Sequence, residues 1–446
     1  MGKTLPGRAR FRCFKGCAGT FPLTQAIYRC PTCDGLLEVA HDLDVLRKTS
    51  GDAWRALFDR RWAPTSSSGG NPPSGVWSKR EWVAPEVPDD AIVTTGEGMT
   101  PLYPARRLAI ELGFGELYVK QCGTTHTGSF KDLGMTVLVS VVNHGLRTGM
   151  LAVRAIACAS TGDTSAALAA YGAAAGLPVV VLLPRGMVSV AQLVQPLAHG
   201  AKVLALETDF DGCMAVVREL ANRGLVYLAN SMNPLRIEGQ KTVALEIAQQ
   251  LGWTVPDWIV IPSGNLGNAA ALFAGFTMAK ELGLTNRVPR LCIAQASKAN
   301  PMYRAFIAQT EDVAPMVAEP TQASAIRIGN PVSAARAMAA LRGMNGVVEE
   351  ATENELADAC ARADRTGLYA CPHTGVAIAC AKKLRASGTI GERERVVVVS
   401  TASALKFTEF KLGYHESKLR DVATPLANAP VPLPPDVDVV AEHLLG

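Results

Sequence analysis

Short apolar runs alternate with longer helical segments along most of the chain after residue 100. The runs at 116–120, 155–159, 178–183, 203–206, 226–229, 258–262, 291–294 and 396–400 have the length and composition of strands buried on both faces. Helical patterns lie between them, around 135–142 and at 164–175, 213–222, 239–251 and 268–282. This order predicts an α/β protein with parallel sheets covered by helices on both sides.

Polar loops follow three of these strands, at the end where open α/β sheets bind their ligands. The loop 160–165, Ser-Thr-Gly-Asp-Thr-Ser, offers hydroxyls and backbone N–H groups that could hold a carboxylate. The loop 263–268, Ser-Gly-Asn-Leu-Gly-Asn, has two glycines that permit the close backbone approach of a phosphate cradle. Residues 400–403 add neutral hydroxyls. Taken singly, such loops are more often ordinary turns or helix caps.

A fourth loop, 230–241, combines amides, a hydroxyl and an arginine after a strand. Arg236 could pair with a second anion through two parallel hydrogen bonds. The alternative is a solvated cap at the start of the helix that follows. The residues by themselves leave both interpretations open.

One lysine follows a run of small and hydroxyl residues, 124–134, between a predicted strand and a predicted helix. Ser129 is the expected N-cap, which places Lys131 in the first helical turn. The positive end of the helix dipole disfavours an ammonium there, and a neutral amine suits Schiff-base chemistry with a carbonyl cofactor. A lysine in a first turn is more often a solvated surface group, so this stretch does not decide the matter alone.

Four of the eleven cysteines lie within the first 33 residues, as CxxxC and CxxC pairs formed by Cys13, Cys17, Cys30 and Cys33. Four thiolates can close a tetrahedral zinc site that holds together a segment too small for its own core. The alternative is a hairpin with four reduced cysteines. The other cysteines lie singly in apolar segments, which indicates a reducing compartment, and we expect a cytoplasmic protein.

The charge balance and the hydropathy limit the classes of partner. A net charge of +4 over 446 residues argues against nucleic acid as a partner. No apolar run reaches the length of a transmembrane helix, and the N-terminus lacks the apolar core of a signal peptide. We therefore expect no nucleic acid, no membrane and a small-molecule ligand.

Six segments, taken together and in order, closely resemble threonine synthase of the plant-like branch. They are 126–132, 157–165, 209–214, 230–241, 263–268 and 371–377. The resemblance covers about residues 35–414. It implies the fold of the fold-type-II (tryptophan synthase β-like) pyridoxal-phosphate enzymes, with two parallel-sheet domains and, in this chain, a zinc-ribbon-like start.

The resemblance also implies roles for single residues. Lys131 corresponds to the lysine that binds pyridoxal 5'-phosphate covalently, with Phe130 near the ring. Thr401 corresponds to the hydroxyl that faces the ring nitrogen, and Asp163 stands where many relatives place an asparagine beside the ring hydroxyl. The cofactor phosphate is assigned to Ser263, Gly264, Asn265, Leu266, Gly267 and Asn268. The substrate carboxylate is assigned to Ser160, Thr161 and Thr164, and the substrate phosphate to Asn230, Ser231 and Arg236.

The implied reaction converts O-phospho-L-homoserine and water into L-threonine and phosphate, in a homodimer. Another fold-type-II enzyme, a serine/threonine dehydratase or a cysteine-synthase-like enzyme, is the nearest alternative, and neither needs a second phosphate site. A rival of a different class is a zinc-ribbon protein that binds nucleic acid or has a regulatory role, with a catalytic body that is no longer active. The expected domains are a ribbon-like segment (1–38), an extension (39–115), a large cofactor-binding domain (116–150 with 236–420), a small inserted domain (151–235) and a tail (421–446).

Overall fold

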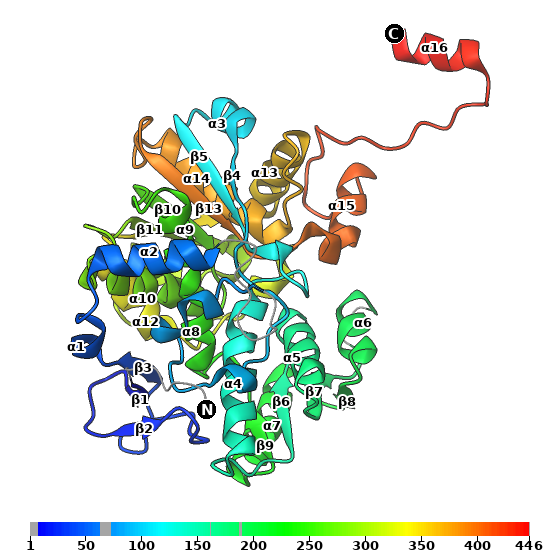
Figure 1. The fold of residues 1–446 in the computed structure, drawn as a ribbon. Helices are drawn as coiled ribbons and strands as arrows, with labels where there is room; N and C mark the ends of the chain where they lie inside the picture. Colours follow the sequence, from blue (N-terminus) through cyan, green and yellow to red (C-terminus); the bar gives the residue numbers. More distant parts are fainter. Residues whose placement is uncertain (1–7, 63–72, 161, 187–189, 446) are drawn as a thin grey trace.

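The computed structural model describes residues 8–62, 73–160, 162–186 and 190–445. It begins with a three-stranded antiparallel sheet of order β2-β1-β3, formed by β1 (Ala9–Cys13), β2 (Thr20–Pro22) and β3 (Leu37–His41). Two α-helices, α1 (Leu43–Leu46) and α2 (Gly51–Trp62), and two 3₁₀ helices, η1 (Trp77–Trp82) and η2 (Asp89–Ala91), then lead to the body of the protein (Figure 1).

A six-stranded sheet of order β12-β11-β10-β13-β5-β4 forms one half of the body. Its strands are β4 (Leu102–Pro104), β5 (Glu116–Gln121), β10 (Trp258–Pro262), β11 (Arg290–Ala296), β12 (Val347–Ala351) and β13 (Arg395–Ser400). Every pair is parallel except β4 with β5. Because side chains alternate along a strand, Trp258 and Val260 pack with α13 (Glu353–Arg365) and α14 (Pro372–Ala386), and Ile259 and Ile261 with α10 (Gly267–Glu281) and α12 (Ala334–Gly343).

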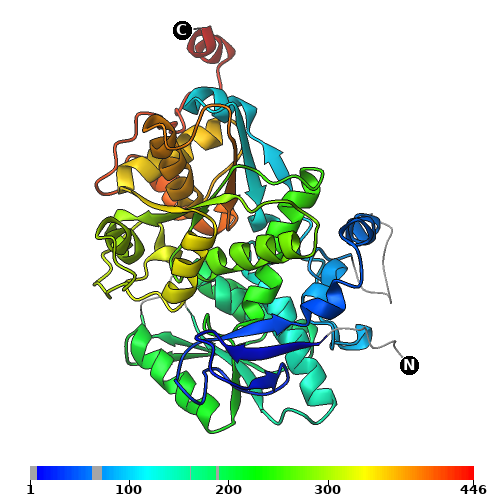
Figure 2. The same cartoon turned by 90° about the vertical axis from the view of Figure 1, so that its left-hand side faces the viewer.

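A four-stranded parallel sheet of order β8-β7-β6-β9 forms the other half. It consists of β6 (Ala155–Ala159), β7 (Val179–Pro184), β8 (Lys202–Leu206) and β9 (Val226–Leu228), with α5 (Asp163–Ala174), α6 (Val190–Ala198) and α7 (Phe210–Asn222) around it. The two sheets lie in different halves of the molecule, with α4 (Lys131–Arg147) and α8 (Leu235–Gln240) between them (Figures 1 and 2). The α/β architecture with two parallel-sheet units is therefore confirmed.

The remaining elements connect these layers. They are α3 (Arg106–Leu112), η3 (Cys122–Thr124), α9 (Thr242–Gln250), η4 (Ser297–Ala299), α11 (Pro301–Ile307), η5 (Ser324–Ile326), η6 (Ala404–Phe407), α15 (Thr408–His415) and α16 (Val437–Leu445). After α15 the chain first packs against the body through Leu419, Val422 and Leu426, and it then extends away and ends in α16 (Figure 1). Within the described ranges, no helix has the length and apolar character needed to cross a membrane.

Two sequence predictions about helices are wrong. The helix expected at 239–251 is two helices, α8 and α9, which meet at Lys241. Gly239 lies where α8 crosses α4, and a Cβ there would come within 1.6 Å of the Leu133 carbonyl oxygen, so only glycine fits this crossing. Ser129 is not the N-cap of α4: Phe130 holds that position, and the Ser129 hydroxyl accepts only a long, 3.4 Å hydrogen bond from the Lys131 N–H.

A buried ionic triad attaches the N-terminal sheet to α8. His41, at the end of β3, places Nε2 2.6 Å from Glu238 Oε2 and 3.0 Å from Lys241 Nζ, and Lys241 also pairs with Glu238. All three side chains are buried. Burial raises the pKa of Glu238, but Lys241 and His41 outweigh this effect and hold it below its usual value, so the carboxylate stays charged.

Candidate active site

The loop that carries Lys131 is paired with the chain just after β13. Phe130 N–H donates to the Thr401 carbonyl at 2.9 Å, and Ser403 N–H donates to the Gly128 carbonyl at 2.9 Å. Since β5 and β13 are parallel neighbours, their carboxyl ends open onto the same edge of the sheet. Lys131 and Thr401 therefore lie together, as the sequence predicts.

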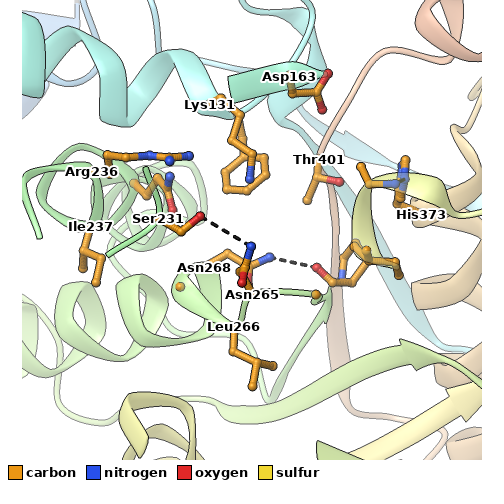
Figure 3. A pocket seen from close by; sticks show the side chains of 17 residues that line it. Lys131, Asp163, Ser231, Arg236, Ile237, Asn265, Leu266, Asn268, His373 and Thr401 are labelled. Carbon is orange, nitrogen blue, oxygen red and sulfur yellow. Dashed lines mark hydrogen bonds between the residues drawn. The ribbon is translucent and has the colours of Figure 1, made fainter. Parts of the chain in front are cut away.

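A cavity opens at this edge, between the two halves of the molecule (Figure 3). It is lined by Phe130, Lys131, Asp163, Ser231, Arg236, Ile237, Gln240, Pro262, Gly264, Asn265, Leu266, Gly267, Asn268, Ala325, Ile326, His373 and Thr401. Residues from strand ends far apart in the sequence thus meet in one place.

The loop 264–268 presents backbone donors at the start of α10. Within the described parts of the chain, no protein group accepts a hydrogen bond from the N–H groups of residues 264–268. Leu266 has a left-handed backbone (φ +65°), and a Cβ on Gly264 would lie 2.8 Å from Ile326 Cα, so the loop is tightly held. Consecutive free N–H groups at a helix N-terminus form an anion site.

Lys131 lies at the centre of the cavity, with its ammonium 4.1 Å from the centre of the Phe130 ring (Figure 3). The pKa of Lys131 is lowered to about 7, because loss of water around the amine and, to a smaller extent, the charge of Arg236 outweigh the opposing effect of Asp163. A large fraction of Lys131 is therefore a neutral nucleophile near neutral pH.

Arg236 is a buried cation, and the described residues place no buried anion beside it. Its two terminal nitrogens donate to the Ala229 carbonyl and to Thr164 Oγ1, both at 3.2 Å, while Nε has no partner in the described structure. No carboxylate in the described ranges forms an ion pair with it, and burial lowers its pKa to about 10. A buried guanidinium that lines a cavity and lacks a counter-charge is chemically suited to bind an anion.

The predicted substrate residues Asn230 and Ser160 and the predicted cofactor-phosphate residue Ser263 do not line the cavity. Asn230 Oδ1 accepts the Ala159 N–H at 3.0 Å, and Asn230 Nδ2 donates to the Ala159 carbonyl at 2.8 Å. The Asn230 side chain therefore ties the end of β6 to the chain after β9. Ser160 Oγ accepts the N–H groups of Gly162 and Ser165 at 3.3 Å, and Ser263 Oγ donates to Asn268 Oδ1. Thr161 lies outside the described residues.

His373 lines the cavity, although the sequence reasoning assigned it no role. Burial lowers its pKa to about 4, so the ring is neutral, and Nε2 accepts the Ala325 N–H at 3.0 Å. The ring proton therefore lies on Nδ1. The sequence feature that could have indicated His373 is the segment 371–377, because Pro372 there starts a helix at the edge of the sheet that carries the site.

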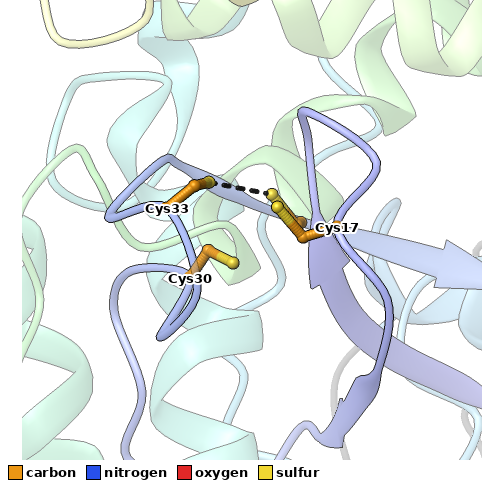
Figure 4. Close-up of side chains that lie close together, drawn as sticks. Cys17, Cys30 and Cys33 are labelled. Atoms are coloured by element: carbon orange, nitrogen blue, oxygen red, sulfur yellow. Dashed lines mark hydrogen bonds between the residues drawn. The ribbon is translucent and has the colours of Figure 1, made fainter.

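The four N-terminal cysteines lie together. Cys13 ends β1 and Cys17 lies in the segment after it, while Cys30 and Cys33 lie in the loop between β2 and β3; Figure 4 labels Cys17, Cys30 and Cys33. Their Sγ atoms all lie within 4.8 Å of one another, and those of Cys13 and Cys33 are 3.6 Å apart. Tetrahedral zinc with Zn–S bonds of about 2.3 Å needs sulfurs at roughly this spacing. The donor set thus fits a zinc ion.

Comparison with known proteins agrees with this geometry. Residues 93–402 match the family model described as pyridoxal-phosphate dependent enzyme, so the chain belongs to that family. It is 52% identical over 431 residues to threonine synthase 2, chloroplastic, of Arabidopsis thaliana, covering 95% of this chain and 83% of that protein. It is 40% identical to the threonine synthase of Methanocaldococcus jannaschii, covering 89% and 92%. Within the family, the chain belongs to the threonine synthases.

Solved structures share the fold. Threonine synthase from Escherichia coli covers 98% of this chain and 99% of its own with a TM-score of 0.65 at 21% identity. The pyridoxal-phosphate-bound threonine synthase from Brucella melitensis covers 90% of each chain with a TM-score of 0.66 at 20% identity. The likeness to the plant protein spans 95% of the chain, so the expected limits of 35–414 were too narrow.

Proposed function

We propose that this chain converts O-phospho-L-homoserine and water into L-threonine and inorganic phosphate, with pyridoxal 5'-phosphate bound at Lys131. The observation that carries this proposal is Arg236, a buried cation that faces the same cavity as the reactive lysine and has no carboxylate partner within the described chain. One anion site serves the phosphate of the cofactor, and the other serves the phosphate of the substrate.

The residues present fit the cofactor. The free N–H groups of residues 264–268 suit its phosphate, Lys131 supplies a neutral amine, and Thr401 offers a neutral hydroxyl for the ring nitrogen. Ser263 supports the loop from behind, and Phe130 and Asp163 border the space for the ring. When bound, pyridoxal phosphate supplies an aldehyde and an electron-withdrawing ring that stabilises negative charge beside it.

Different side chains of the protein serve proton transfer and substrate binding. Lys131, with a pKa of about 7, can accept the proton from the α-carbon of the substrate and return it. Arg236 holds the phosphate that leaves, assisted by Ser231 on the same side of the cavity. Thr164, in the first turn of α5, is assigned to the substrate carboxylate. Ser160 shapes the loop before α5 by accepting the Gly162 and Ser165 N–H groups, and Asn230 ties Ala159 to the chain before α8.

A serine or threonine dehydratase is the rival within the same fold, and it needs no second anion site. Its substrate carries no phosphate, so a buried, unpaired arginine would serve no purpose in it and would destabilise the protein. Arg236 therefore favours the phosphorylated substrate.

The test is direct. Purified protein is loaded with pyridoxal phosphate and reduced with borohydride, and the modified peptide is identified by mass spectrometry. The tag should lie on Lys131, and unreduced protein should release phosphate and threonine in equal amounts from O-phosphohomoserine. Lys131→Ala should abolish both results, while the exposed Lys418→Ala should change neither. A tag on another lysine, or ammonia release from threonine without phosphate release from O-phosphohomoserine, would overturn the proposal.

We further propose that Cys13, Cys17, Cys30 and Cys33 bind one structural zinc ion. Two observations support this: their sulfurs converge, and the N-terminal sheet is short and has only a few buried apolar side chains of its own. A homodimer, a cytoplasmic location and the five-part domain division stay proposals. The name of the Arabidopsis relative places that protein in the chloroplast, so fractionation of the source cells tests the location, and light scattering tests the dimer. Strand β4 joins the six-stranded sheet although it precedes residue 116, the proposed start of the large domain.

A further inference from the structure

Lys406 lies just beyond the cavity, in η6, and its ammonium binds three oxygens from three parts of the chain. It is 2.8 Å from Asp163 Oδ1 on α5 and donates to the Thr127 carbonyl at 3.0 Å and to Gln195 Oε1 on α6 at 3.1 Å. An ammonium has three N–H donors, so every donor is used. The side chains of Lys406 and Asp163 are only 18% and 9% exposed, which separates this contact from an ordinary surface ion pair.

The stem of Lys406 also packs against the loop that carries Lys131. Gly128 has φ +78°, and a Cβ added there would lie 3.2 Å from Lys406 Cδ. Ser403 N–H donates to the Gly128 carbonyl in the same place. The Lys406 ammonium thus binds the Thr127 carbonyl, while its aliphatic chain packs on Gly128. These contacts fix the loop that carries Lys131 to the residues after β13.

Asp163 is the carboxylate whose charge affects the pKa of Lys131. The charged or titratable groups around Lys131 are Asp163 from α5, Arg236 from α8 and His373 from α14, and His373 is neutral. Asp163 raises the pKa of Lys131, and Arg236 lowers it. The charge of Asp163 is in turn matched by Lys406.

We propose that Lys406 is a positioning residue of this site: it neutralises Asp163 and holds the Thr127 carbonyl, and so keeps the carboxylate and the loop beside Lys131 in a single arrangement. The inference rests on the proposed function, in which Lys131 is the reacting amine. Without Lys406, Asp163 faces Lys131 uncompensated and stabilises its ammonium form.

The experiment follows the reactivity of Lys131 in cofactor-free protein. Lysines are acylated over a range of pH, and the rate at Lys131 is measured by mass spectrometry. Wild-type reactivity should be half-maximal near pH 7, the pKa given by the surroundings of Lys131. An opposite charge nearby raises an amine's pKa by about 1 unit or more, so Lys406→Met should slow labelling at pH 7 by about fivefold and leave the plateau rate at high pH unchanged.

Three further variants isolate the cause. Lys406→Arg should restore most of the wild-type profile, and Lys418→Met, which removes a lysine 72% exposed to solvent, should match the wild type. Lys406→Met combined with Asp163→Asn leaves no uncompensated carboxylate, so it should return labelling at pH 7 to at least the wild-type rate. This pair also keeps the test valid if the single variant folds poorly.

Two outcomes would overturn the inference: a Lys406→Met profile that superimposes on the wild type, or a double variant shifted as far as the single one. Both are distinct from a failure of the proposed function. That failure shows in the wild-type protein itself, as absence of borohydride trapping at Lys131, and does not depend on Lys406.

Discussion

Replacing Arg236 by methionine should weaken binding of the phosphorylated substrate far more than it changes stability. Burial lowers the pKa of Arg236 from 12.5 to about 10, which means that keeping the charge costs about 3 kcal/mol in the cofactor-free protein. Its hydrogen bonds to Ala229 and Thr164 return about 1 kcal/mol each. These contributions nearly cancel, so Arg236→Met should change the free energy of unfolding by no more than about 1–2 kcal/mol.

Binding of the substrate phosphate should respond differently. Charge-assisted hydrogen bonds contribute about 1.5–3 kcal/mol, so the KM for O-phosphohomoserine and the inhibition constant of inorganic phosphate should rise by about 10- to 150-fold. Steady-state kinetics measures KM and the inhibition constant, and urea unfolding of cofactor-free protein measures the change in the free energy of unfolding.

The chain offers a matched control in Arg336 on α12. This arginine is equally buried, its pKa is likewise lowered to about 10, and it also donates to a backbone carbonyl, that of Leu37, but it does not line the cavity. Arg336→Met should leave KM unchanged. An unaltered KM in Arg236→Met, or an equal rise in both variants, would refute the reasoning.

Three other outcomes are expected. Because the pKa of Lys131 is about 7, capture of pyridoxal phosphate by cofactor-free protein should slow about tenfold per pH unit below 7 and level off above it; stopped-flow absorbance measures this, and a flat profile contradicts it. Gly264→Ala, whose Cβ would lie 2.8 Å from Ile326 Cα, should weaken cofactor binding by about 5- to 150-fold, whereas Gly267→Ala, with its nearest atom at 3.8 Å, should lose much less in the same equilibrium titration. Metal analysis should find one zinc per chain, and Cys33→Ser should remove it and lower the melting temperature; a metal-free wild type would exclude the zinc site.

The buried strands were predictable because their sequences are continuous apolar runs between polar loops. β6 and β10 have the bounds expected from the sequence. β12 was missed because it lies at the edge of the sheet, where Glu349 and Glu350 interrupt the apolar pattern without penalty. The division of 239–251 into two helices follows from the crossing of α8 with α4, which a local pattern does not contain.

The site was predictable to the level of loops but not of single side chains. Strand ends in a parallel sheet share one edge, so Lys131, Thr401 and the loop 264–268 had to meet. Which polar groups face the cavity depends on local hydrogen bonds. Asn230 and Ser160 turn to nearby backbone groups instead, and His373 enters the site from a helix that the strand pattern does not report.

The triad of His41, Glu238 and Lys241 has a consequence for shortened forms of this protein. Glu238 is two residues from Arg236 on the same helix, so His41 supplies from the N-terminal sheet a group that helps to balance buried charge next to Arg236. Removal of the N-terminal residues to obtain a minimal enzyme would expose Glu238 and Lys241 to solvent and remove a contact that holds α8 in place. The cysteine-bearing segment is thus part of the architecture that the catalytic half requires, and cannot be treated as a detachable appendage.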